Sequence, residues 1–164
     1  MSSYCTRTGC TTTSDAAVEF CPACGATGIA VEPITLKALL TSDGLRRGVP
    51  SSPRYCANAQ CDVVYFDTAA AVVFPETNVI VPVRAKHPDN DAIPLCYCFG
   101  YTEKSIRDEI EQTGASTATR SITAEVKAGR CACEVKNPKG SCCLGDVARV
   151  ERNRVASNLT LTTP

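Results

Sequence analysis

Cysteine is the residue type whose number and spacing in this chain could support chemistry. The 164 residues include twelve cysteines, which fall into six close pairs. The pairs are Cys5/Cys10, Cys21/Cys24, Cys56/Cys61, Cys96/Cys98, Cys131/Cys133 and Cys142/Cys143. In a reducing compartment, clustered thiols bind metal more often than they form disulfides. Residues 1–30 lack the basic and then apolar segments of a secretory signal. We therefore predict a cytoplasmic protein whose cysteines bind metal.

The overall composition excludes several other kinds of partner. Lys plus Arg and Asp plus Glu both total 17, so the net charge is zero and gives no support for a nucleic-acid partner or for a charged membrane surface. Since there is no apolar run near the length of a membrane span, direct membrane insertion is not expected. Aromatic residues make up only 5% of the chain and Trp is absent. A small core of this kind needs further stabilisation, which metal ions could supply.

The first candidate metal ligands are Cys21 and Cys24, in the run Cys-Pro-Ala-Cys-Gly. Two intervening residues allow both thiolates to reach one ion across a tight turn, and Gly25 allows the backbone to turn with its amides near the sulfurs. Zinc takes four such ligands in a tetrahedron, so a second pair must complete the site.

Two pairs could complete this zinc site, and the spacing alone leaves both open. Cys56 and Cys61 stand just before a predicted strand, as in zinc ribbons, although the intervening stretch is longer than usual. Cys5 and Cys10 are closer in sequence, and the alternative for them is an N-terminal pair without a ligand role. A closed site with four thiolates would be structural, because catalytic zinc keeps an open position.

The elements expected around these cysteines differ between the two parts of the chain. Short β-branched and aromatic runs predict strands over 62–66, 69–74 and 79–83, and residues 31–40 begin as a strand and continue with helical spacing. The later part predicts helices over 102–113 and 119–128 and a third from about 144. Residues 84–94 resemble a linker, so we place a domain boundary near residue 90.

A second group of cysteines lies at the ends of these predicted helices. Cys96 and Cys98 precede the first helix, Cys131 follows the second, and Cys142 and Cys143 precede the third. Helix N-termini offer free N–H groups and a positive dipole end, which suits an anionic iron–sulfur cluster held by thiolates. The spacing differs from that of plant ferredoxins, so from the residues alone the metal could also be zinc.

The longest cysteine-containing segments resemble a known family. The segments CYCFGYT from Cys96 and KAGRCACEVKNPKGSCCLGDV from Lys127 are similar to the N-terminal domain of CopZ-type copper chaperones. The earlier segments CPACG, TLKALL and CANAQCDVVYF resemble the zinc-binding half of the same domain. The resemblance spans about residues 20–150, and the second half also resembles bacterioferritin-associated ferredoxin.

This resemblance implies a fold class and two cofactors. It implies an α+β protein with a small zinc-ribbon-like β-rich domain at 1–90, a helical [2Fe–2S] domain at 91–156 and a flexible tail at 157–164. The implied Zn²⁺ ligands are Cys21, Cys24, Cys56 and Cys61. The implied cluster ligands are Cys96, Cys98, Cys131 and Cys143.

Cys143 is preferred over Cys142 because the ferredoxin-like pattern has apolar residues one, four and seven positions after the ligand. Those positions after Cys143 are Leu144, Val147 and Val150. Cys133 and Cys142 are then expected to be free or neighbouring thiols, or a pair that binds copper transiently.

The implied function is metal homeostasis or redox chemistry with a protein redox or metal-transport partner. The chain would bind Cu⁺, or reduce Cu²⁺ to Cu⁺ for that partner. In the family a domain of M-x-C-x-x-C type carries Cu⁺, and these residues contain no such motif, so we do not predict copper delivery by them alone. The alternatives are a ferredoxin-like electron carrier or cluster donor, and a structural adaptor. No enzyme machinery beyond metal reduction is predicted.

Overall fold

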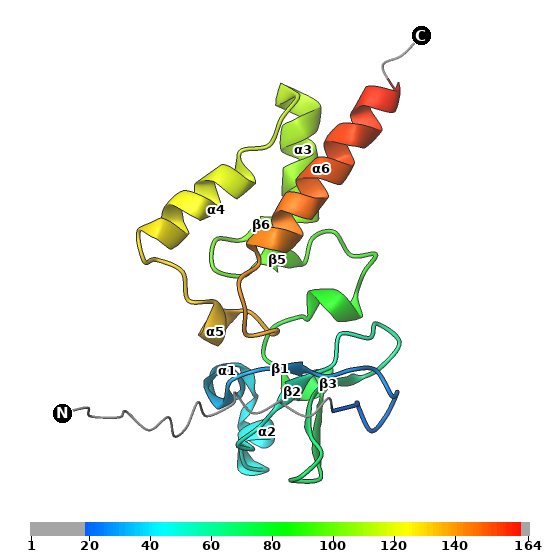
Figure 1. Ribbon diagram of the computed structural model, residues 1–164, viewed down its shortest axis with the longest axis vertical. Helices are drawn as coiled ribbons and strands as arrows, with labels where there is room; N and C mark the ends of the chain where they lie inside the picture. Colours follow the sequence, from blue (N-terminus) through cyan, green and yellow to red (C-terminus); the bar gives the residue numbers. More distant parts are fainter. Residues whose placement is uncertain (1–18, 162–164) are drawn as a thin grey trace, which may run out of the picture.

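The computed structural model describes residues 19–161, which form a β-rich N-terminal half and a helical C-terminal half (Figure 1). The N-terminal half contains β1 (Ile29–Ala30), α1 (Pro33–Leu39), α2 (Ser42–Arg46), β2 (Arg54–Tyr55), β3 (Val63–Asp67), β4 (Val72–Pro75) and the 3₁₀ turns η1 (Glu76–Asn78) and η2 (Arg84–Lys86). The C-terminal half contains β5 (Pro94–Cys96), β6 (Tyr101–Thr102), α3 (Glu103–Thr113), α4 (Ala118–Lys127), α5 (Cys133–Lys136) and α6 (Leu144–Leu161). The predicted mixture of sheet and helix is confirmed.

The N-terminal half is built on a four-stranded antiparallel sheet in the order β1-β2-β3-β4. Every residue of β3 is buried, as expected for its run of β-branched and aromatic side chains. Leu36 of α1 packs into the same core as Tyr65 and Phe74. Helix α1 begins at Pro33, whose fixed φ and missing N–H suit the first helical position. The predicted strand start at residue 31 is therefore wrong, because the strand is the shorter β1 and ends before it.

The strand predicted over 79–83 is also wrong. Val79 forms only an isolated bridge with Leu40, after the 3₁₀ turn η1. Pro82 has no N–H to donate, and the N–H of Val83 donates to the carboxylate of Glu76 at 2.9 Å. The N–H of Ile80 donates to the carbonyl of Leu39, so the donors of this segment are taken by Leu39 and Glu76 and no strand ladder develops.

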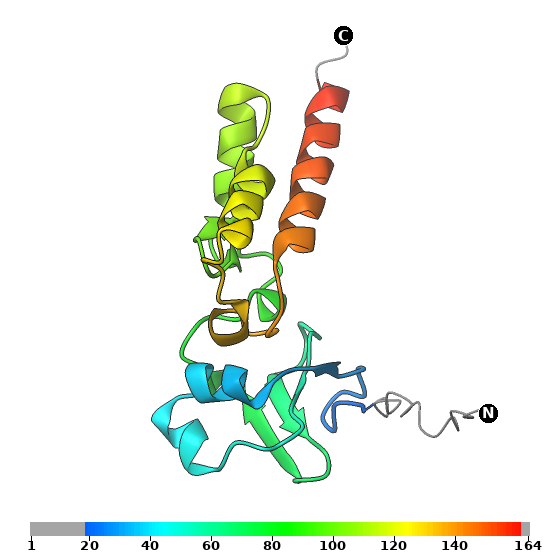
Figure 2. The same ribbon diagram turned by 60° about the vertical axis from the view of Figure 1, so that its left-hand side comes forward.

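The helical half packs α3 and α4 against the long helix α6, and Figure 2 shows the three lying along one another. Thr102 caps α3 in a reciprocal capping box with Ser105, and Gly114 ends the helix with φ 81°. Ile106, Ile122 and Val147 fill the core between the helices and are almost fully buried. The three predicted helices are thus present. Helix α6 continues to Leu161, which is inside the segment expected to be a tail.

The two halves meet at the short helix α5, which contacts α1. The buried hydroxyl of Tyr65 donates to the carbonyl of Pro138 at 2.7 Å, and the hydroxyl of Thr35 donates to the carbonyl of Glu134 at 2.7 Å. Glu134 lies in α5 and Pro138 follows it by two residues. The segment around α5 is therefore hydrogen-bonded to the core of the N-terminal half.

The connecting segment 84–94 is held by Tyr97, the residue between Cys96 and Cys98. The hydroxyl of Tyr97 donates to the carbonyl of Pro82 at 2.8 Å and accepts from the N–H of Arg84 at 3.0 Å. The side chain of Arg84 also pairs with Glu103 at 2.8 Å, at the start of α3. The segment predicted to be a linker is thus attached at its N-terminal end to the helical half.

None of the helices within residues 19–161 is both long enough and apolar enough to cross a bilayer.

The contact between the halves makes a first prediction. Tyr65→Phe should lower the free energy of unfolding by about 1–3 kcal/mol, because the carbonyl of Pro138 loses its buried donor. Urea unfolding measures the change. Tyr101→Phe, at a partly exposed ring, is the matched control and should change stability by less than about 0.5 kcal/mol. Equal effects of the two substitutions would show that the hydrogen bond does not stabilise the fold.

Candidate metal centres

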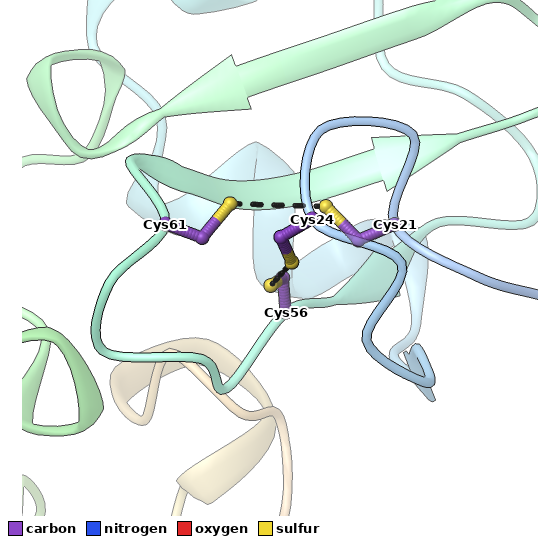
Figure 3. A group of neighbouring side chains, drawn as sticks. All are labelled: Cys21, Cys24, Cys56 and Cys61. Carbon is purple, nitrogen blue, oxygen red and sulfur yellow. Dashed lines mark hydrogen bonds between the residues drawn. The ribbon is translucent and has the colours of Figure 1, made fainter.

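Four thiols of the N-terminal half converge on one point, as Figure 3 shows. The sulfurs of Cys21 and Cys61 lie 3.9 Å apart, and those of Cys24 and Cys56 lie 3.6 Å apart. All four sulfurs lie within 4.8 Å of one another. A tetrahedral zinc with four sulfurs at about 2.3 Å places those sulfurs about 3.8 Å apart. The geometry therefore fits a single tetrahedral ion.

The first two of these thiols are presented by a tight turn. The N–H of Gly25 donates to the carbonyl of Cys21 at 2.8 Å, and Gly25 has φ 71°, a conformation that glycine adopts without strain. The N–H of Cys21 in turn donates to the carbonyl of Ala26 at 2.8 Å. The turn brings both sulfurs next to those of Cys61 and Cys56, and the Cys-x-x-Cys spacing predicted that the two could reach one ion.

The other two thiols come from the loop between β2 and β3. Cys56 follows β2, and its N–H donates to the carbonyl of Val64 at 2.9 Å, while Cys61 stands two residues before β3. Within the loop, Asn58 accepts from the N–H of Cys61 at 3.2 Å. The amine of the buried residue Lys86 donates to the carbonyl of Asn58 at 2.8 Å and connects the loop to η2. Adjacent antiparallel strands thus place Cys56 and Cys61 side by side.

The pKa values of three of these thiols are shifted in opposite directions. The backbone N–H of Ala26 is the main cause that lowers the pKa of Cys24 to about 6. Burial raises the pKa of Cys56 to about 12 and also raises the pKa of Cys61. Four thiolates cannot coexist at this spacing without a compensating cation. Only a bound metal ion would let all four ionise near neutral pH.

A second group of thiols lies in the helical half, at the junction between β5, α5 and α6. The sulfurs of Cys98, Cys131 and Cys133 lie within 4.8 Å of one another. The sulfur of Cys133 lies 3.7 Å from the sulfur of Cys98 and 3.2 Å from that of Cys131. The N–H of Ala132 donates to the sulfur of Cys98 at 3.4 Å. We call these three residues the thiol triad.

Cys96 and Cys143 form a buried pair beside the triad. Cys96 ends β5 and Cys143 directly precedes α6, where its carbonyl accepts from the N–H of Asp146 at 3.0 Å. A hydrogen bond from Cys143 is the main cause that lowers the pKa of Cys96 to about 6, and the same bond raises the pKa of Cys143. The charge of Cys133 also raises the pKa of Cys143, so the pair and the triad are close enough to form one region of five thiols.

The structure brings most of the predicted site residues together. The four predicted zinc ligands form one group, whereas Cys5 and Cys10 lie outside the described residues. Of the four predicted cluster ligands, Cys98 and Cys131 belong to the triad, and Cys96 and Cys143 form the pair. Cys133 was not predicted as a ligand, yet it lies at the centre of the triad. The repeated Cys-x-Cys spacing of Cys96/Cys98 and Cys131/Cys133 was the signal that could have found it.

The chain is similar to CopZ proteins. The family model described as a zinc binding domain of CopZ matches residues 18–80. The X-ray structure of the Archaeoglobus fulgidus CopZ N-terminal domain superposes with a TM-score of 0.65 at 30% sequence identity, covering 80% of this chain and 97% of that one. The chain belongs to the CopZ N-terminal domain family. The CopZ-type resemblance seen in the sequence is thereby confirmed for this module.

The full-length relative is longer than the matched region. The copper chaperone CopZ of Archaeoglobus fulgidus is 32% identical over 123 residues, which cover 75% of this chain and 57% of that protein. This chain therefore spans little more than half the length of the curated CopZ.

The packing beside the first centre makes a second prediction. A Cβ added at Gly28 would lie 2.5 Å from Phe66 and 2.8 Å from the Cβ of Arg54, and Phe66 packs with Cys56 and Cys61. Gly28→Ala should lower the free energy of unfolding by about 1–3 kcal/mol and speed zinc loss to a chelator. The readouts are thermal unfolding and chromophoric chelator competition.

Gly145→Ala is the matched control for this substitution. A Cβ there meets nothing within 4 Å, and alanine is the better helix former by up to about 1 kcal/mol. Zinc release from Gly145→Ala should match that of the unsubstituted chain. Unchanged release from Gly28→Ala would contradict a role for this close contact in supporting the first centre.

Proposed function

We propose that this chain is a metal-handling redox module of the CopZ type. In it, a structural Zn²⁺ stabilises the N-terminal half, and a [2Fe–2S] cluster in the helical half reduces Cu²⁺ to Cu⁺ for a protein partner. The observation that carries the proposal is the presence of two separate thiol groups in a member of this family: one of four sulfurs, and one made of the thiol triad and the neighbouring pair Cys96 and Cys143. Such thiols require a reducing compartment, in keeping with the cytoplasmic location predicted from the sequence.

Zinc is the metal that best fits the first centre. Its four donors are all sulfur, their spacing is tetrahedral, and Cys21, Cys56 and Cys61 are buried. No position remains open for a substrate, so the ion would be structural. Because the unfolded chain has no such site, the binding free energy of zinc adds to the stability of this half.

The donors of the second centre fit a [2Fe–2S] cluster. We propose Cys96, Cys98 and Cys143 as ligands, with the remaining place taken from the pair Cys131 and Cys133. The sequence pattern favours Cys131, and the contact at 3.7 Å from Cys98 favours Cys133. Such a cluster supplies one electron at a time and takes four thiolates.

The surrounding residues suit electron exchange at one edge of this centre. Cys96 and Cys143 are almost fully buried, whereas Cys98 and Cys131 are partly exposed. The N–H of Ala132 points at the sulfur of Cys98 and would stabilise added negative charge there. Copper is a substrate in this proposal: Cu²⁺ gains one electron and becomes Cu⁺, an ion that thiolates hold well.

A ferredoxin-like electron carrier is the second candidate function. The same partly exposed edge at Cys98 and Cys131 would allow a protein partner to approach the cluster closely. The two candidates differ in the electron acceptor, which is copper in the first and a redox protein in the second.

The metal assignment is tested on the full chain purified without oxygen. We expect about two irons, two sulfides and one zinc per chain, and visible absorption that bleaches with dithionite. Cys143→Ala should lose iron and keep zinc, whereas the adjacent control Cys142→Ala should keep both. Zinc in both centres, without visible absorption, would overturn the redox assignment.

Copper reduction is tested by mixing the dithionite-reduced chain, freed of excess reductant, with Cu²⁺ and a chromophoric Cu⁺ chelator. One Cu⁺ should form for each cluster whose visible absorption returns, because the reaction transfers one electron. Thiols also reduce Cu²⁺, so the oxidised chain and Cys143→Ala serve as controls and should yield Cu⁺ more slowly. Equal rates in reduced and oxidised chains would exclude the cluster as the electron source and favour the carrier function.

A further inference from the structure

The second centre contains one thiol more than a cluster needs. A [2Fe–2S] cluster takes four thiolates, two for each iron. The pair of Cys96 and Cys143 is buried and suits one iron. The triad offers three thiols for the two places at the other iron. The extra thiol therefore belongs to the triad, in which Cys98 and Cys131 are partly exposed.

Cys98 is the fixed member of the triad. It follows the buried pair member Cys96 by two residues, and its sulfur accepts the N–H of Ala132 at 3.4 Å. Both remaining thiols are close to it: Cys133 at 3.7 Å, and Cys131 within 4.8 Å. The choice of ligand is therefore between the two cysteines of one Cys-x-Cys pair.

The backbone places those two thiols almost at the same point. Cys131 precedes α5, and Cys133 is its first residue. Ala132 between them has φ −139° and ψ 49°, outside the helical region, and both side chains turn to the same side, with their sulfurs 3.2 Å apart. Because the two sulfurs lie 3.2 Å apart, a change of side-chain rotamer would be enough to replace one sulfur by the other at the iron.

We propose that Cys131 and Cys133 are interchangeable ligands of the outer iron, so that one of them is a reserve ligand. The inference rests on the [2Fe–2S] cluster of the proposed function. In the exchange, one iron–sulfur bond breaks and another forms, and a proton passes from the arriving thiol to the departing thiolate. No oxidant or reductant is needed. The cluster then survives the loss of either thiol.

The test compares three variants of the full chain, purified without oxygen. Cys131→Ala and Cys133→Ala should each keep more than half of the iron and sulfide of the unsubstituted chain. The iron and sulfide contents of the double variant should be lower by at least about ten-fold. Alanine is used because a serine oxygen could itself bind iron. One of the single variants should also shift the electron paramagnetic resonance of the reduced cluster, which identifies the resident ligand. Cys142→Ala, at the exposed neighbouring thiol, is the matched control and should leave all readouts unchanged.

The outcomes separate this inference from the proposed function. A single variant that loses as much iron as the double variant overturns it, since that thiol is then a fixed ligand. A double variant that keeps its iron also overturns it, because a different residue must then hold the place. Zinc content near one per chain shows that each variant is folded. An unsubstituted chain without iron or sulfide would instead refute the proposed function itself.

Discussion

The mutual repulsion of converging thiolates is the constraint on which the rest of this structure depends. Cys24 ionises readily, whereas burial holds Cys56 and Cys61 protonated, although all four sulfurs of the first group share one small volume. A divalent cation would compensate the negative charges, so that all four thiols could ionise and bind it. The chain has few aromatic side chains for a core, so a metal ion bound by these thiols would add stability to the loop between β2 and β3.

The second centre handles the same constraint differently. Its buried end is completed by Cys96 and Cys143, which share a proton in a hydrogen bond. Its outer end lies nearer to solvent, and the backbone N–H of Ala132 directs positive partial charge at Cys98. Burial at one end and polar contact at the other suit a group that must keep its place while its charge changes.

The local features could be predicted from the sequence, because they depend on residues within a few positions of one another. The Cys-x-x-Cys turn, the cap at Thr102 and the stop at Gly114 each follow from side-chain chemistry within a few positions. The four-thiol group was also predicted, but through resemblance to a family rather than through spacing, since spacing left Cys5 and Cys10 in competition.

Features that depend on distant contacts were missed. Residues 79–83 have strand-like composition, yet the N–H of Ile80 donates to the carbonyl of Leu39 at 2.9 Å and only an isolated bridge forms between Val79 and Leu40. The Cys-x-Cys spacing marks Cys133 as a possible ligand, but only the fold shows that its sulfur lies 3.7 Å from that of Cys98, 35 residues earlier. The short helices α2 and α5 were also unpredicted, because tertiary packing rather than an apolar repeat holds such short helices.

The hydrogen bonds from Tyr65 and Thr35 to the segment around α5 have a consequence for biogenesis. The N-terminal half leaves the ribosome first. Once folded, it presents the hydroxyls of Tyr65 and Thr35, to which the later segment around α5 hydrogen-bonds. That segment carries Cys133 and leads into Cys143. With the two metals of the proposed function, maturation would follow a fixed sequence in which zinc supply precedes iron–sulfur insertion, and a cell starved of zinc would accumulate chains unable to receive the proposed cluster.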